Sequence, residues 1–119
     1  MRSLRIKVTC GSEDPERCNQ AFTVAAAAAA AGADVGLWLT GEAAWFALPG
    51  RAEEFALPHA TALADLRDTV LELGQVTVCT QCAVRRGITP DAVLPGVRVA
   101  GAATFAEEIL ADGVQALVY

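Results

Sequence analysis

Two cysteines separated by two residues are the side chains of this sequence best suited to covalent chemistry. Cys79 ends the apolar segment 76–78, and Cys82 follows three residues later. A thiol at a point where a strand ends and a helix begins lies among backbone N–H groups that have no partner within the helix. These groups favour the thiolate, which is the nucleophilic form of cysteine. We therefore expect Cys79 to be a nucleophilic or sulfur-carrying thiol, the alternative being a small apolar side chain packed at the end of a strand.

The residues after Cys79 add a second thiol and two positive charges. Cys82 completes a Cys-x-x-Cys motif, which forms a reversible disulfide in thioredoxin-like proteins. The motif follows an expected strand, as that interpretation requires, but no tryptophan precedes it and no cis-proline loop is recognisable. Cys82 is therefore either a redox or resolving thiol or a packing residue on a short helix. Arg85 and Arg86 are expected to help lower the pKa of Cys79.

Three further side chains are candidates for the same site or for the core. Cys10 follows the first expected strand, but a disulfide between Cys10 and Cys79 needs Cα atoms within about 7 Å and so depends on strand order. Cys18 shares a helical face with Phe22 and is expected to pack in the core. Glu42 is either a general base at the site or a carboxylate favoured by the dipole at a helix start.

The sequence lacks the signatures of common metal and cofactor sites. A zinc site needs two Cys-x-x-Cys pairs or added histidines, and Cys10 and Cys18 are too widely spaced to be the second pair. Only a fold that brought all four cysteines together would supply one. His59, the one histidine, is expected to be a solvated loop residue. No dinucleotide-binding, Walker or serine-hydrolase motif is present, so we expect no metal and no cofactor.

Size and charge exclude several functional classes. The 119 residues are enough for one domain, spanning residues 1–119, and 54% of them are apolar. The net charge of −5 argues against nucleic-acid binding, which needs clustered Lys and Arg. No apolar run approaches the roughly 20 residues that span a bilayer, and the start of the chain lacks a signal-peptide pattern. We expect a cytoplasmic protein whose cysteines are free thiols, metal ligands or catalytic groups.

Strand and helix patterns alternate along the whole chain. Alternating or continuous apolar residues predict strands at 4–9, 34–40, 75–79, 97–99 and 115–119. Helical spacing, alanine content and flanking Gly or Pro predict helices at 15–31, 41–48, 61–73, 81–86 and 103–112.

This alternation predicts an α/β fold built on an open, mostly or wholly parallel sheet with helices on both faces. Sites in such folds lie outside the carboxyl ends of the strands. We therefore expect Cys10, the turn 40–42, Cys79 and Cys82 to line one crevice. Trp38, Trp45 and Phe46 are expected either to fill the core or to form a subunit interface, where aromatic residues concentrate.

With these residues in view, the chain resembles the DsrE/DsrF-like family of small sulfur-relay proteins, which includes the TusD-type subunits. The resemblance covers essentially the whole chain and rests on the order and spacing of several segments rather than on any single motif. These segments are the loop 13–17 leading into Ala21-Phe22, the turn 32–35 running to 39–42, Cys79 ahead of 85–88, and the ending 96–97 to 101–107.

The resemblance implies a three-layer α/β/α fold with a five-stranded parallel sheet, assembled as a homo- or hetero-oligomer. It also implies sulfur carried as a persulfide on a cysteine after a central strand, taken from a donor protein and passed to an acceptor. Cys79 matches that cysteine, whereas Cys82, Cys10 and Cys18 are not part of the TusD-type pattern. Two alternatives stay open: a non-catalytic oligomeric module that binds a ligand or partner, and a Cys-x-x-Cys redox protein.

Overall fold

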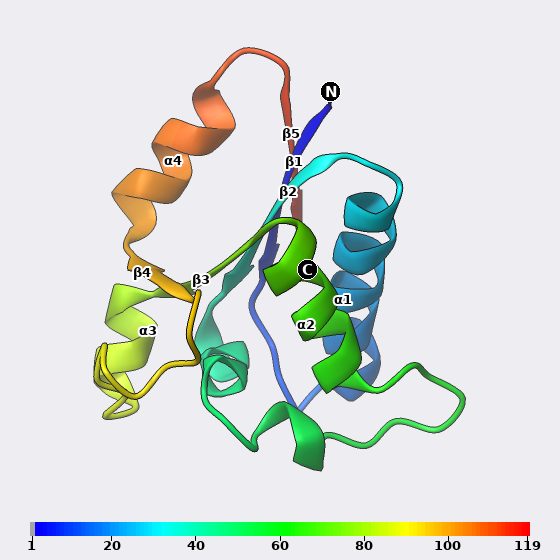
Figure 1. The fold of residues 1–119 in the computed structure, drawn as a ribbon. Helices are drawn as coiled ribbons and strands as arrows, with labels where there is room; N and C mark the ends of the chain where they lie inside the picture. The colour runs from blue at the N-terminus through cyan, green and yellow to red at the C-terminus, as the bar shows by residue number, and fades with distance from the viewer. Residues whose placement is uncertain (1) are drawn as a thin grey trace.

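A sheet of five parallel strands forms the middle layer of the fold (Figure 1). The structure is a computed structural model and describes residues 2–119. The strands lie in the order β4-β3-β2-β1-β5, so β1, β2 and β3 occupy the centre. Their bounds are β1 Ser3–Val8, β2 Asp34–Leu39, β3 Gln75–Cys79, β4 Arg98–Ala100 and β5 Val114–Val118. The expected parallel α/β sheet is confirmed.

Helices connect the strands and cover both faces of the sheet, which confirms the three-layer arrangement. Helix α1 begins at a proline, whose fixed φ suits the first turn of a helix. The segment expected as a helix at 41–48 is a 3₁₀ helix, η1. The helices are α1 Pro15–Ala30, η1 Gly41–Ala47, η2 Ala52–Glu54, α2 Leu63–Leu73, α3 Thr80–Arg85 and α4 Ala102–Leu110. Within residues 2–119, no helix is long and apolar enough to cross a membrane.

Helices α1 and α2 pack on one face of the sheet and enclose the main core (Figure 1). Every second residue of the central strands points into this core, as the period of a strand requires. Phe22 of α1 is fully buried there and meets Phe46 of η1 edge-on, with ring centroids 6.0 Å apart. The buried sheet residues on this face are Ile6, Val8, Val35, Leu37, Leu39, Val76 and Val78.

Helices α3 and α4 lie on the opposite side of the sheet (Figure 1). The register pairs Lys7 of β1 with Trp38 of β2, and Trp38 with Thr77 of β3, so these residues share this second face. Trp38 is buried and packs edge-on against Phe105 of α4 at 5.2 Å. Trp38 and Phe46 are therefore core residues of this chain. Trp45 is half-buried and packs against the main core.

Candidate functional site

Cys79 lies where β3 ends and α3 begins, at the carboxyl edge of the sheet. Alternation along β3 places Val78 in the main core and turns Thr77 and Cys79 toward the α3 and α4 side. Cys79 stands opposite Ala100 of β4 and keeps 9% of its surface exposed, whereas Cys18 has none. Cys79 is the residue that precedes the first turn of α3, and its backbone is still extended.

The surroundings of the Cys79 sulfur are polar. The thiol donates a hydrogen bond to Oε1 of Gln81 at 3.4 Å, and the neutral side chain makes no capping bond to the helix amides. Burial raises the pKa of Cys79, but the backbone amide and thiol of Cys82, the backbone amide of Gln81 and the charge of Lys7 outweigh burial. The pKa of Cys79 therefore lies below its ordinary value, as a nucleophilic thiol requires.

Cys82 is held beside Cys79 by a contact from the end of β2. The backbone N–H of Gly41 donates a hydrogen bond to the Cys82 sulfur at 3.2 Å. Gly41 has a φ of 55°, in the left-handed region, and a Cβ at this position would collide with the carbonyl oxygen of Thr9. Only glycine fits here without strain, so a glycine is what allows the 40–42 turn to lie against the backbone of Thr9, after β1.

The basic pair and Glu42 occupy different places around α3. Arg86 forms an ion pair with Glu42, with Nε and Oε2 2.8 Å apart, and donates to the Cys82 carbonyl oxygen at 3.1 Å. Glu42 is thus a partner of Arg86. Arg85 is exposed in the last turn of α3, at the opposite end of that helix from Cys79. No hydrogen bond among residues 2–119 joins Arg85 to Cys79, so no contact supports the expected effect of Arg85 on the Cys79 sulfur.

Cys10 lies apart from Cys79 because of the strand order. Cys10 follows β1. Because β2 lies between β1 and β3, the backbones of β1 and β3 are roughly 10 Å apart. The loop at Cys10 nevertheless borders η1, since a Cβ on Gly11 would lie 2.8 Å from the carbonyl oxygen of Glu42. Burial, followed by the charges of Asp14 and Glu13, raises the pKa of Cys10.

Cys18 is fully buried in the main core, where burial strongly raises the pKa of its thiol. All four cysteines are free thiols. Within residues 2–119, no group of three or more His, Cys, Asp or Glu side chains is arranged to hold a metal ion.

Lys7 and Gln81 are two site residues that the sequence analysis did not identify. Gln81 accepts the thiol hydrogen bond, and Lys7 acts on Cys79 from β1 through its charge. Gln81 could have been noticed, because it lies inside the Cys-x-x-Cys motif. Lys7 is 72 positions away from Cys79 in the sequence, and only the strand order shows that the two share a region of the sheet.

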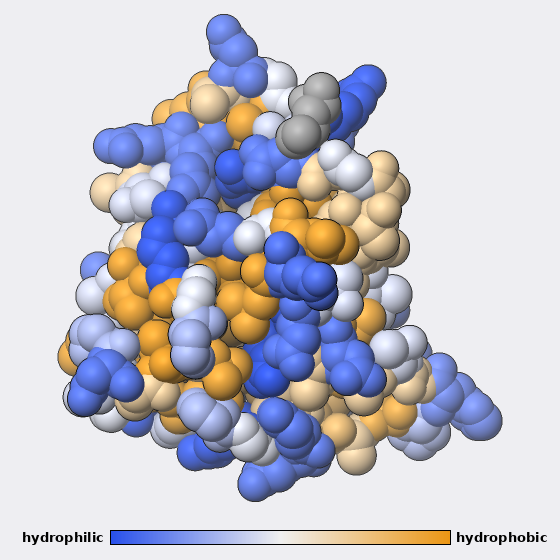
Figure 2. Space-filling model, viewed as in Figure 1, coloured by the Kyte–Doolittle hydropathy of each residue, from blue (hydrophilic) through white to orange (hydrophobic). Residues whose placement is uncertain are grey.

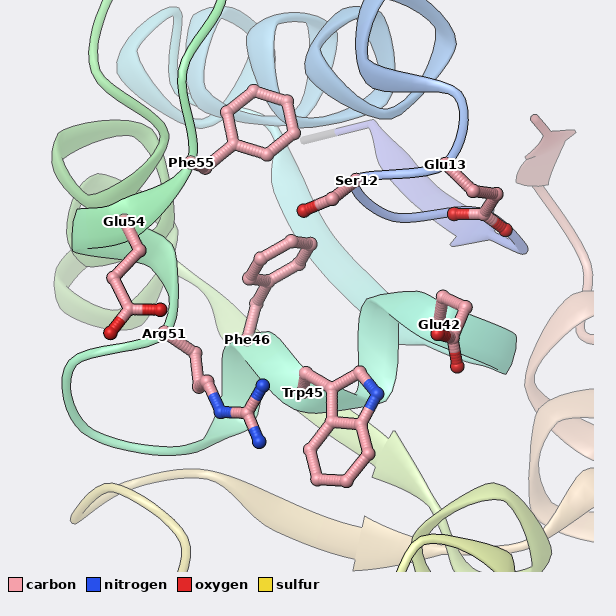
Figure 3. A pocket seen from close by; sticks show the side chains of 8 residues that line it. All are labelled: Ser12, Glu13, Glu42, Trp45, Phe46, Arg51, Glu54 and Phe55. Carbon is pink, nitrogen blue, oxygen red and sulfur yellow. The ribbon is translucent and has the colours of Figure 1, made fainter.

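A pocket of about 260 Å³ opens next to η1 (Figure 3). Figure 3 shows Glu42 and Glu13 at one end of the pocket and Arg51 and Glu54 at the other. The guanidinium of Arg51 stacks on the ring of Trp45, 4.2 Å from its centroid. The pocket is lined by Ser12, Glu13, Glu42, Trp45, Phe46, Arg51, Glu54 and Phe55.

Comparison with known families assigns this chain to one group. A profile of the DsrE/DsrF-like family matches residues 5–118, which is nearly the whole chain. The chain therefore belongs to the DsrE/DsrF-like family, a sulfur-relay type of family, as the resemblance indicated. No curated protein matches it.

Two solved structures are similar in fold. The ychN protein from E. coli superposes with a TM-score of 0.80 at 20% sequence identity, and the match covers 100% of both chains. BT1422 from Bacteroides thetaiotaomicron, a conserved protein of unknown function, gives a TM-score of 0.59 at 16% identity, covering 99% of this chain and 95% of that one. At these identities the likeness supports the shared architecture.

Proposed function

We propose that this chain is a sulfur-relay protein that carries sulfane sulfur as a persulfide on Cys79. The observation that supports the proposal most is the position of Cys79 after a central strand, with a pKa lowered by the amides and thiol that follow it despite burial. Family membership supports the same class of chemistry. We place the protein among sulfur carriers or sulfurtransferases without assigning a turnover reaction.

The proposed transfer needs only thiol chemistry. The Cys79 thiolate attacks the outer sulfur of a persulfide on a donor protein, forming a new S–S bond on Cys79 and releasing the donor thiolate. A thiolate of the acceptor then attacks the outer sulfur on Cys79, and Cys79 leaves as a thiolate. Each step exchanges one S–S bond for another, so no external oxidant is required.

Cys82 provides a competing outcome for the loaded protein. Its thiolate can attack the inner sulfur of the Cys79 persulfide, which forms a Cys79–Cys82 disulfide and releases hydrosulfide. An external dithiol would then be needed to restore both thiols. The proximity of the two thiols favours this reaction, and it also keeps a Cys-x-x-Cys redox protein as the second candidate function. A dithiol reduction potential within the cytosolic range would support that candidate.

Partners are part of the proposal. A relay needs a donor and an acceptor to reach the sulfur of Cys79, a residue that keeps only 9% of its surface exposed, so we propose that both dock around α3. Val84 of α3 is 71% exposed, and Figure 2 shows apolar surface gathered around this part of the molecule. We also propose a homo-oligomer, which the family resemblance implies, and a cytoplasmic location, which the sequence analysis predicts. A non-catalytic binding module would instead use the pocket beside η1.

Mass spectrometry of the protein after incubation with a cysteine desulfurase and cysteine tests the proposal. We expect a mass gain of one sulfur atom, located on the peptide that contains Cys79. Cys79→Ser should show no gain, whereas Cys82→Ser should load normally and release less hydrosulfide. Absence of a gain in both the wild type and Cys82→Ser, or an equal gain in Cys79→Ser, would count against sulfur carrying.

A further inference from the structure

Lys7, the one lysine of this chain, lies on the same face of the sheet as Cys79. The register places Lys7 level with Trp38 and Thr77, and Cys79 is the next residue after Thr77 to point to that face. The backbones of β1 and β3 are roughly 10 Å apart, because one strand lies between them. A lysine carries its charge on a flexible four-carbon stem, so its ammonium can cover part of that separation.

Phe105 of α4 holds the ammonium of Lys7 close to the sheet. The Nζ atom lies 4.4 Å from the centroid of the Phe105 ring, a distance at which a cation is attracted to the face of an aromatic ring. Phe105 is itself buried and fixed edge-on against Trp38. The charge is therefore held between the sheet and α4 rather than extended into solvent.

The other cations of this face are neutralised by carboxylates. Arg5 pairs with Asp34 and Glu108, and Arg98 pairs with Glu108 at 2.8 Å. Within residues 2–119, no carboxylate forms an ion pair with Lys7.

On the α3 side of Cys79, the two arginines are either paired with a carboxylate or exposed. Arg86 is paired with Glu42, and Arg85 lies at the exposed end of α3. The charge of Lys7 also lowers the pKa of Cys79, after the contacts from Cys82 and Gln81.

We propose that Lys7, held on the Phe105 ring, is the positioning cation that stabilises the anionic sulfur of Cys79, both as a thiolate and as a persulfide. This role rests on the proposed sulfur-carrying function. It assigns to a strand residue the charge stabilisation that the sequence analysis placed on Arg85 and Arg86.

The pH dependence of Cys79 alkylation by iodoacetamide, measured on the peptide that contains Cys79, tests this role. Lys7→Met keeps most of the side-chain volume and removes the charge. We expect the midpoint of its alkylation profile to rise by about half to one pH unit, leaving about three- to tenfold less thiolate below the midpoint. Lys7→Arg should stay near the wild-type midpoint because it keeps the charge. Arg85→Gln, which removes an exposed charge, should leave the midpoint unchanged.

A second variant covers the case in which Lys7→Met does not fold. Phe105→Leu retains the ammonium but removes the ring beneath it, and we expect a smaller rise of the midpoint. An unchanged midpoint in folded Lys7→Met or in folded Phe105→Leu would overturn the proposal, as would a rise in Arg85→Gln equal to that in Lys7→Met.

The alkylation readout requires no sulfur donor, so it separates this inference from the proposed function. A shifted midpoint in Lys7→Met together with no sulfur loading in the wild type would refute sulfur carrying and leave the charge effect established. Normal loading with an unshifted midpoint would refute the role of Lys7 alone.

Discussion

The backbone N–H of Gly41 donates a hydrogen bond to the sulfur of Cys82 at 3.2 Å, which joins the end of β2 to α3. This contact fixes the second cysteine of the Cys-x-x-Cys motif while the first lies at the end of β3. Neighbouring parallel strands end side by side, so their following turns meet at one edge. The geometry of the candidate site therefore depends on the 40–42 turn as well as on α3.

Gly41→Ala should disturb this site and destabilise the protein. The φ of 55° and the collision of a Cβ with the Thr9 carbonyl oxygen both oppose a side chain at this position. Gly50→Ala is a matched control, because its φ of 82° is also positive but no atom lies within 4 Å of its added Cβ. We expect Gly50→Ala to cost about 1–2 kcal/mol and Gly41→Ala clearly more. If urea unfolding gave the two variants equal losses of unfolding free energy, the backbone at Gly41 would not be packed tightly against Thr9.

The cysteines should differ in reactivity in the native protein. At neutral pH, we expect iodoacetamide to modify Cys79 before Cys10 and Cys18, because the pKa of Cys79 is lowered and those of the other two are raised. Peptide mapping after short exposures measures the order. Denatured protein provides the control, in which the three thiols should react at similar rates. Faster native modification of Cys10 than of Cys79 would contradict the structure.

Phe22→Ala should be among the most destabilising core substitutions. Phe22 is fully buried, and its removal leaves a cavity between α1 and η1, so we expect a loss of about 3–5 kcal/mol. Phe55→Ala is the control, since Phe55 packs on the same Phe46 ring at 5.7 Å but is only half-buried. Chemical denaturation of both variants should give the smaller loss for Phe55→Ala, and the reverse order would refute this core assignment.

Glu108 should contribute to the acid dependence of stability. Burial raises its pKa, but hydrogen bonds from Arg98 and Trp38 and the charges of Arg98 and Arg5 outweigh burial and lower the pKa. Because the folded pKa is the lower one, the stabilisation is complete above the unfolded value, about 4.3, and is lost as the pH falls through the folded pKa.

Glu108→Gln should therefore reduce stability at neutral pH by about 1–3 kcal/mol and flatten the decline of stability with acid. Glu107→Gln serves as the control, because Glu107 is exposed and forms no ion pair among residues 2–119. Unfolding free energies measured between neutral and acid pH distinguish the two variants. If the stability of Glu108→Gln still declined steeply with acid, the contribution assigned to Glu108 would be contradicted.

Local patterns in the sequence were enough to predict most of the elements. The strand 75–79 was predicted with the bounds that β3 has, and Pro15 was correctly predicted as the first residue of α1. These features depend on neighbouring residues only. The type of η1 was not predicted, because its apolar residues are compatible with either helix.

The arrangement around Cys79 could be predicted only in part. Parallel topology correctly indicated that the 40–42 turn and the Cys79–Cys82 segment would meet, since strand ends gather at one edge. The separation of Cys10 from Cys79 and the approach of Lys7 depend on strand order, which no local pattern encodes. The Glu108 network likewise joins residues up to 103 positions apart.

Cyanolysis of the sulfur-loaded protein tests the central claim most directly, because cyanide removes the outer sulfur of a persulfide as thiocyanate and leaves the thiolate. After loading from a desulfurase and removal of the donor, the wild type should release one thiocyanate per loaded chain and regain a free Cys79. Cys79→Ser treated in the same way should release none. Thiocyanate from Cys79→Ser in the wild-type amount, or none from either the wild type or Cys82→Ser, would contradict the account.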